Sequence, residues 1–330
     1  MSSFKDGATE RAARKIASLS PELRRLTEEG ARIIKSGGLV AFPTETVYGL
    51  GANALDPDAV ASIYEAKGRP SDNPLILHVS SVEMAERVVE INARALLLID
   101  TFWPGPLSVV LPAKDIVPPR TRGGLPTAAV RMPDSAPALA LIEMSGLPIA
   151  APSANISGRP SPTDAQTVRS DMGERIPLVI DGGDTRFGVE STVVDMTGEH
   201  AVLLRPGGVS KEDLEKTLDE EVLLPQDQQI IKRSPGTRYR HYAPSVPLVL
   251  CAAHLVPEES RKWAWMGIKE PEGTPCAAVL FKNKAEYAKG LFRALRMLEK
   301  SGAEVIYAES PDEAGIGRAL KDRLERAAGK

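Results

Sequence analysis

Strand-like and helix-like segments alternate along most of this chain, and this alternation limits its fold more than any other feature. Short apolar runs, such as residues 39–42, 107–111 and 147–151, alternate up to about residue 217 with segments whose apolar residues recur at helical spacing. Such alternation predicts an α/β domain. Because several connections are as short as hairpins, we expect its sheet to be mixed rather than purely parallel.

The pattern changes near residue 219 and starts again near residue 246. The segment between them is loop-like, and the residues after it read as strands and helices once more. A chain of 330 residues is long enough for two domains. We therefore expect a loosely held N-terminal extension (1–21), a larger α/β domain (22–218), a linker (219–245) and a small Rossmann-like α/β domain (246–330).

Composition excludes several classes of protein. A formal net charge of -3 argues against a chain that binds nucleic acid over its whole surface, although a local basic groove stays possible. The two cysteines, Cys251 and Cys276, lack metal-ligand spacing and indicate no disulfide framework. No run of 18 apolar residues and no signal-peptide pattern occurs, so we expect a cytoplasmic protein without a membrane span.

A basic loop follows the first strongly predicted helix of the larger domain. Lys67 and Arg69 lie two residues apart, with Asn73 downstream, between a helix over 56–66 and a buried strand over 75–79. Lysine offers a point charge and arginine a planar fork, a combination that suits a polyphosphate. The alternative interpretation is a solvated turn with ordinary surface charges.

A second polar loop, over residues 151–163, lies between a buried strand and a helix that begins near Asp164. Its side chains include Ser153, Asn155 and Ser161, whose hydroxyl and amide groups can contact a phosphate or a sugar. The spacing of a Walker loop is absent. Serine and asparagine also cap helices routinely, so a plain polar turn is the alternative.

Arg131 lies in a strand that otherwise consists of small and apolar residues. A buried arginine is costly unless an anion pairs with it. That anion is either a ligand or a structural partner, such as a nearby aspartate.

Taken in order, these segments resemble the YrdC-like family in its long, two-domain form. The resemblance covers about residues 22–330 and rests on KGRP at 67–70, NPL at 73–75, PSAN at 152–155, SG at 157–158, ESTVVD at 190–195, LRPG at 204–207, and SPG at 234–236 with HYAP at 241–244 in the linker. It implies a twisted, open, mixed α/β sheet around a positively lined cavity. One departure is Ser108, where a threonine is more usual in the family.

The resemblance also implies an activity. Members of the family are nucleotidyltransferases that condense L-threonine, bicarbonate and ATP, with Mg²⁺, into threonylcarbamoyl-AMP, pyrophosphate and water. A separate transferase complex then moves the threonylcarbamoyl group to adenosine 37 of tRNAs that read ANN codons. Contact between this chain and tRNA is a further expectation.

Site residues follow from the resemblance position by position. Those expected around threonine are Thr46, His78, Arg131 and Ser191. Those expected around ATP are Lys67, Arg69, Asn73, Thr127, Ser153, Asn155, Ser161, Arg205 and Tyr242. The linker would close over the site as a lid, with Tyr242 preferred to Tyr239 as the contacting residue.

Two other functions remain open on the sequence. An RNA-binding accessory protein would clasp tRNA through its phosphates and would not turn over ATP. A carbamoyl-phosphate-using hydrogenase maturation enzyme would need additional zinc-binding cysteines, and this chain has two cysteines in total.

Overall fold

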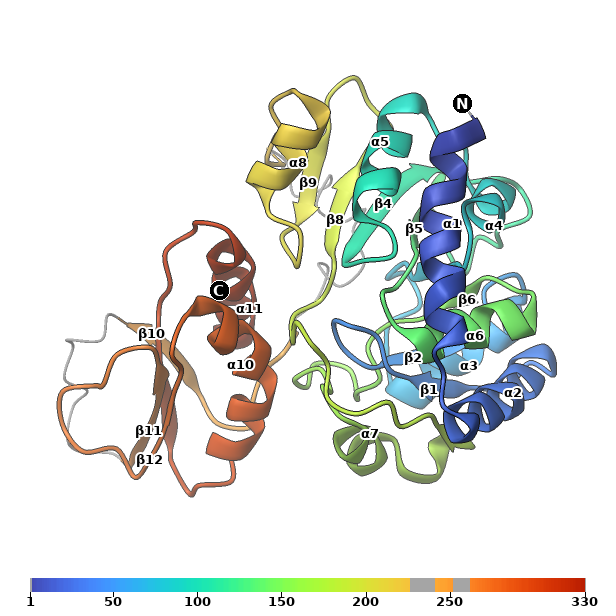
Figure 1. Cartoon of the computed structure of the whole chain (residues 1–330). Helices are drawn as coiled ribbons and strands as arrows, with labels where there is room; N and C mark the ends of the chain where they lie inside the picture. The colour runs from blue at the N-terminus through green and yellow to red at the C-terminus, as the bar shows by residue number, and fades with distance from the viewer. Residues whose placement is uncertain (1, 226–240, 252–261, 330) are drawn as a thin grey trace.

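Two separate β-sheets divide the molecule into two α/β units that lie side by side (Figure 1). The structure is a computed structural model that describes residues 2–225, 241–251 and 262–329. The predicted α/β class is confirmed for both units. None of the described helices is long and apolar enough to cross a membrane.

The larger unit is built on a nine-stranded sheet with the order β7-β1-β2-β6-β3-β5-β4-β8-β9. The sheet contains antiparallel pairs, such as β1 with β2, and parallel pairs, such as β3 with β5, so the predicted mixed sheet is confirmed. The strands are β1 (Val40–Phe42), β2 (Gly49–Asn53), β3 (Ile76–His78), β4 (Leu107–Pro112), β5 (Thr127–Arg131), β6 (Ile149–Ala150), β7 (Leu178–Val179), β8 (Thr192–Asp195) and β9 (Val202–Arg205).

Strand β2 was not expected from the sequence, because glycine and alanine make up three of its five residues. The structure gives the reason for one of these glycines. A Cβ on Gly51 would lie 2.7 Å from both Phe42 on β1 and Ile149 on β6. The strand therefore lacks a side chain where the aromatic ring of its neighbour needs the space.

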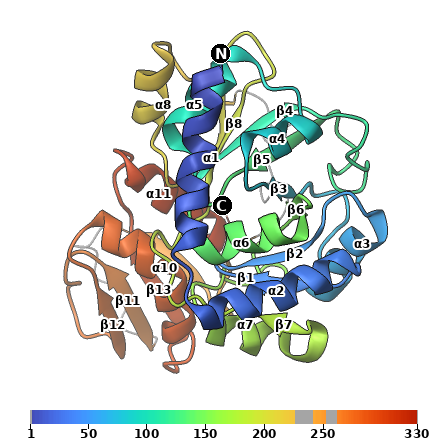
Figure 2. The ribbon, with the colours of Figure 1, turned by 45° about the vertical axis from the view of Figure 1, so that its right-hand side comes forward.

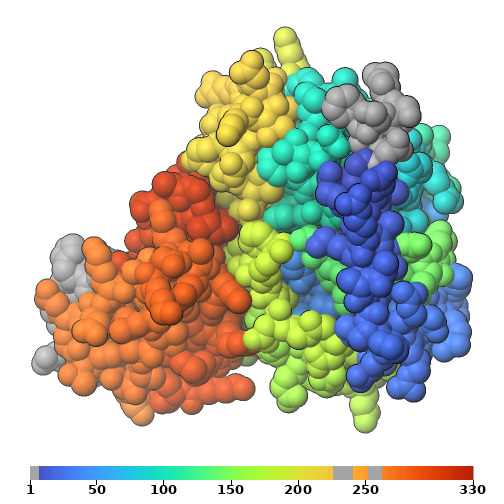
Figure 3. All heavy atoms as spheres, in the orientation of Figure 1, coloured from blue at the N-terminus to red at the C-terminus, as the bar shows by residue number. Residues whose placement is uncertain are grey.

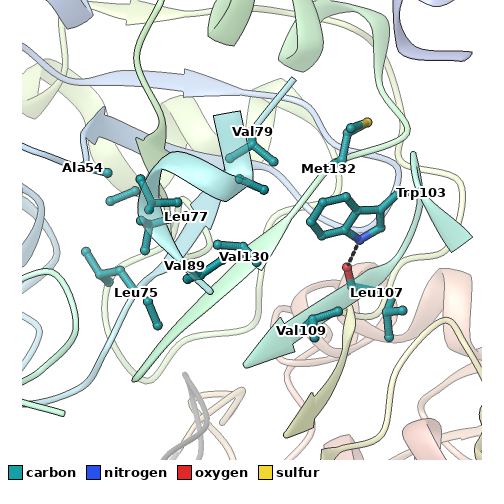
Figure 4. Close-up of a cluster of buried hydrophobic side chains, with 14 of the residues drawn as sticks. Ala54, Leu75, Leu77, Val79, Val89, Trp103, Leu107, Val109, Val130 and Met132 are labelled. Carbon is teal, nitrogen blue, oxygen red and sulfur yellow. Dashed lines mark hydrogen bonds between the residues drawn. The ribbon is translucent and has the colours of Figure 1, made fainter. Parts of the chain in front are cut away.

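Helices cover this sheet, and one cluster of apolar side chains forms most of its core. Leu77 on β3, Val109 on β4 and Val130 on β5 belong to this cluster, as does Trp103, whose Nε1 donates to the Leu107 carbonyl at 2.8 Å (Figure 4). The helices of this unit are α1 (Ser2–Ala17), α2 (Pro21–Lys35), α3 (Pro57–Lys67), α4 (Val82–Val88), α5 (Ala93–Phe102), α6 (Ala136–Ser145), α7 (Ala165–Met172) and α8 (Lys211–Leu218).

The N-terminal segment is not the loosely held extension that the sequence suggested. It forms α1, which lies along the larger unit against α5 and α6 (Figure 2). Ala8, Ala12 and Ile16 are buried in the main core. The sequence did not indicate this packing, because the helix is mostly polar and its buried residues are mainly alanines. Alanine contributes little to a hydrophobic pattern, although it fits close helix contacts.

The smaller unit has four parallel strands in the order β10-β13-β11-β12. They are β10 (Leu248–Cys251), β11 (Trp263–Gly267), β12 (Ala277–Leu280) and β13 (Val305–Glu309). Two helices, α10 (Lys284–Leu298) and α11 (Ile316–Ala328), lie on the side of this sheet that faces the larger unit (Figure 1). In Figure 3 the atoms of the smaller unit press against yellow-green atoms of the larger one.

Replacing the buried Ala12 by aspartate should unfold the chain more easily. The substitution places an unpaired carboxylate in the core, so we expect the free energy of unfolding to fall by about 3 kcal/mol or more. Ala13→Asp on the exposed face of the same helix is the matched control and should change it by less than about 0.5 kcal/mol. Urea unfolding measures both, and equal effects would contradict the packing of α1.

Candidate active site

A cavity opens where the carboxyl ends of β3 and β5 meet the linker. It encloses about 640 Å³, part of it open to solvent. Strands β3 and β5 are parallel, and their register places His78 beside Arg131. Ligands of open α/β sheets bind at the carboxyl ends of strands, so the topology alone makes this the place to look for a site.

Nine of the thirteen predicted site residues line this cavity. They are Thr46, Arg69, His78, Arg131, Ser153, Asn155, Ser191, Arg205 and Tyr242. The structure thus brings together segments from the basic loop, the second polar loop, β5, β9 and the linker. Tyr239, the other linker tyrosine, lies outside the described residues.

Arg131 is held by the loop that precedes β2. Its Nη2 lies 2.7 Å from Oε1 of Glu45 and donates to Oγ1 of Thr46 at 3.0 Å, and its Nε donates to the Gly105 carbonyl at 3.2 Å. Both charged side chains are almost fully buried. A structural partner for Arg131 therefore exists, as the alternative interpretation required, and it is a glutamate rather than an aspartate.

Ser191 and Arg205 form a second polar group on the cavity wall. Arg205 donates to the Ser191 carbonyl from Nε at 3.1 Å and from Nη2 at 2.9 Å, and Nη2 also reaches the Ser191 hydroxyl at 3.1 Å. The Ser108 hydroxyl lies 2.8 Å from the Ser191 hydroxyl, so serine preserves this contact. Burial lowers the pKa of Arg205 to about 10, and the side chain stays charged at neutral pH.

Lys67 lies behind the second polar loop. It ends α3, whose C-cap Gly68 adopts φ 60°, and its Nζ donates to the carbonyls of Ser153 and Asn155. Burial, with a smaller effect from Arg69, lowers the pKa of this ammonium group well below its usual value. The two motifs that stood out in the sequence are therefore in direct contact.

The other predicted residues are absent from the lining of the cavity. Ser161 donates to Oε1 of Glu190 at 2.7 Å, and the Asn73 carbonyl accepts from the Tyr64 hydroxyl at 3.1 Å. Thr127 begins β5, opposite Pro112. Their expected contacts with ATP stay predictions.

Three polar lining residues were missing from the set predicted from the sequence: Thr44, Glu190 and His241. Thr44 places its Oγ1 2.8 Å from that of Thr46. Glu190 and His241 each precede a predicted residue, Ser191 and Tyr242. Their positions inside the quoted motifs were the available signal.

Charge in the cavity is predominantly positive. Three arginines, Arg69, Arg131 and Arg205, line it together with Glu190. Its two histidines are neutral. Burial lowers the pKa of His78 to about 3, with help from Arg131, and burial lowers that of His241 to about 3, with help from Arg69. The arrangement suits anionic ligands and can stabilise negative charge that develops during a reaction.

The neutral His78 should make stability depend on pH. Its pKa is about 3 when folded and about 6.5 when unfolded, so stability is complete above pH 6.5 and falls as the pH drops toward 3. Each pH unit in that window contributes about 1.4 kcal/mol. We expect urea unfolding of His78→Gln to lose less stability between pH 7 and pH 5 than the wild type does. The exposed His200→Gln variant is the control, and an equal pH dependence in all three proteins would refute the assignment.

Comparison with known proteins agrees with this geometry. The Sua5/YciO/YrdC family model, described as "Telomere recombination", matches residues 32–207. The model described as "Threonylcarbamoyl-AMP synthase, C-terminal domain" matches residues 209–329.

Individual relatives match over nearly the whole chain. The threonylcarbamoyl-AMP synthase of Pyrococcus abyssi is 46% identical over 91% of this chain and 93% of its own length. That of Bacillus subtilis is 44% identical over 91% of this chain and 92% of its own length. The crystal structure of P. abyssi Sua5 complexed with L-threonine superposes with a TM-score of 0.86 at 45% identity, covering 92% of this chain and 94% of that one. By sequence and by fold, this chain belongs to the Sua5/YrdC family of threonylcarbamoyl-AMP synthases.

Proposed function

We propose that this chain condenses L-threonine, bicarbonate and ATP into threonylcarbamoyl-AMP, pyrophosphate and water in the cavity described above. One observation carries the proposal: the same cavity is lined by the buried Arg131 on one side and by Arg69 and Arg205 on another wall. An amino-acid carboxylate and a polyphosphate both need such cations.

The threonine subsite is built around Arg131. Its guanidinium group binds the carboxylate of the amino acid, while Glu45 and Thr46 fix its orientation. Neutral His78 and the Ser191 hydroxyl lie in the same cavity and can bind the polar groups of threonine without adding charge.

The nucleotide subsite is built from Arg69, Arg205 and the second polar loop. Ser153 donates to Oδ1 of Asn155 at 2.5 Å, and Asn155 Nδ2 donates to the Arg159 carbonyl at 2.9 Å, so this loop is internally braced. Lys67 holds the loop from behind by its two carbonyl contacts. Direct contact between Lys67 and a phosphate requires its Nζ to leave those carbonyls.

The proposed reaction has two steps. The amine of threonine attacks bicarbonate, which yields a carbamate and water. A carbamate oxygen then attacks the α-phosphorus of ATP, and the bond to pyrophosphate breaks. Arg69 and Arg205 stabilise the negative charge on the phosphates, and alignment of the substrates supplies much of the barrier reduction, on the order of 7–11 kcal/mol for well-oriented groups.

Magnesium fits this scheme as an ion that arrives with ATP. In the described part of the chain, no three His, Cys, Asp or Glu side chains gather in a way that could hold a metal ion. When bound, Mg²⁺ would neutralise phosphate charge.

The product is a mixed anhydride, which water hydrolyses readily. A threonylcarbamoyl transferase complex should therefore act directly downstream. It would transfer the group to adenosine 37 of tRNAs that read ANN codons. We place both reactions in the cytoplasm. Contact of this chain with tRNA belongs to the same proposal.

The decisive experiment measures pyrophosphate release with each substrate omitted in turn and identifies the product by mass spectrometry. We expect release only when ATP, L-threonine and bicarbonate are all present, with an adduct of threonine, one carbon dioxide unit and AMP. Release with ATP and threonine alone would indicate plain amino-acid adenylation. A folded protein without release that binds tRNA would favour the RNA-binding function.

Two arginine-to-lysine variants should separate the subsites. Arg131→Lys loses the fork that binds a carboxylate, so we expect the KM for threonine to rise by about tenfold or more while the KM for ATP changes little. Arg69→Lys should show the reverse pattern. Thermal unfolding checks that both variants are folded, and a rise in the same KM in both variants would contradict the assignment.

A further inference from the structure

One fully buried arginine of the smaller unit reaches into the larger one. Arg323 lies on α11, and its side chain has no exposed surface. Its Nε donates to Oε2 of Glu190 at 2.6 Å, and its Nη2 donates to the Pro206 carbonyl at 2.9 Å. Its guanidinium carbon lies 5.6 Å from the centre of the Tyr242 ring.

These three contacts fall on three separate segments of the cavity wall. Glu190 and Tyr242 line the cavity themselves, and Pro206 follows Arg205, which also lines it. The segments are packed closely, since a Cβ on Gly207 would lie 2.2 Å from the Thr192 nitrogen. Arg323 therefore joins the loop before β8, the loop after β9 and the linker at a single point.

Tyr242 depends on the smaller unit in a second way. Its backbone has φ 66°, a left-handed conformation that a bulky residue adopts only when its surroundings enforce it. Phe292 on α10 stacks against its ring at 5.1 Å between centroids, and Arg323 on α11 approaches the same ring. Both helices of the smaller unit thus hold this residue in place.

Other ion pairs also join the two units. Arg296 on α10 pairs with Asp171 at 2.6 Å, and Arg293 on the same helix pairs with Asp184 at 2.7 Å, with more solvent around both pairs than around Arg323. Arg296 also donates to the Pro160 carbonyl of the second polar loop, part of the proposed nucleotide subsite. Arg293 pairs with Asp164 and Asp184, neither of which lines the cavity, and is suited to holding the units together.

Removing the guanidinium group of Arg323 would change the balance of charge at the cavity wall that Glu190 and Arg205 line. Glu190 is paired with Arg323, and the positive charge of Arg205 also acts on its carboxylate. Without Arg323, the buried carboxylate would turn toward Arg205 and draw it from Ser191. Lysine cannot replace the fork, because a single ammonium group cannot span the Glu190 carboxylate, the Pro206 carbonyl and the face of Tyr242 with one geometry.

We infer that Arg323 is a positioning residue through which the smaller unit sets the nucleotide-side wall of the cavity, formed by Glu190, Arg205 and Tyr242. The inference rests on the proposed function for its substrates. It assigns the smaller unit a part in the active centre, beyond that of a spacer or docking module.

The test compares Arg323→Lys with the control Arg293→Lys, which alters another arginine of the same interface. We expect the dissociation constant for ATP, measured by calorimetry, to rise by about tenfold or more in Arg323→Lys and less than about twofold in the control. An equal, small change in both variants would overturn the inference.

A double-mutant cycle with Glu190→Gln distinguishes positioning from general destabilisation. If Arg323 acts through Glu190, Arg323→Lys should weaken ATP binding much less in the Glu190→Gln background than in the wild type. Full additivity of the two effects would overturn the inference.

The pH profile gives an independent readout. Glu190 faces Arg323 on α11, Arg205 on β9, His241 and Tyr242 in the linker, and Ser161. Burial acts to raise its pKa, but the two arginines and the Ser161 hydrogen bond hold it below the usual value. In Arg323→Met the acid limb of ATP binding should therefore move to higher pH, and in Arg293→Met it should not. Because calorimetry needs no turnover, these results stand apart from failure of the proposed reaction, which the wild-type release assay would reveal.

Discussion

A guanidinium group that leaves water must keep partners for its charge, and the architecture around the cavity depends on this constraint. Arg131 has Glu45, Arg205 has the carbonyl and hydroxyl of Ser191, and Arg323 has Glu190. Each partner lies on a different segment from its arginine. The pairs therefore fix loops that the hydrophobic core alone would leave adjustable, and they direct the charged groups toward one cavity.

The sequence predicted much of this arrangement where the physical signal was local. The cost of an arginine in an apolar strand pointed to Arg131, and helix 56–66 was predicted from its capping residues, which the structure confirms in Asp56. The same local reasoning failed where a residue's environment comes from distant segments. Lys67 was expected on an accessible loop and is buried at the end of α3, because the fold places the second polar loop over it.

Arg323 shows the limit most clearly. It lies 133 residues from Glu190, on a helix that reads as amphipathic with many charged positions. Nothing in its neighbourhood marks it as buried, since Glu190 and the Pro206 carbonyl, which pair with it, belong to the other unit. The N-terminal helix is the opposite case, in which alanines in a polar sequence meet the core. In both helices, contact between remote segments determines which residues are buried. The periodicity of apolar residues within one segment does not reveal it.

The pairing of β3 with β5 has a consequence for folding fidelity. Successive side chains of a strand point to opposite faces, so a shift of one residue between these strands would separate His78 from Arg131 and turn one of them to the wrong side. Chains trapped in the shifted register could still be compact. Such chains would lack the amino-acid subsite at Arg131. Binding of the amino acid would therefore also indicate that β3 and β5 have paired in their native register.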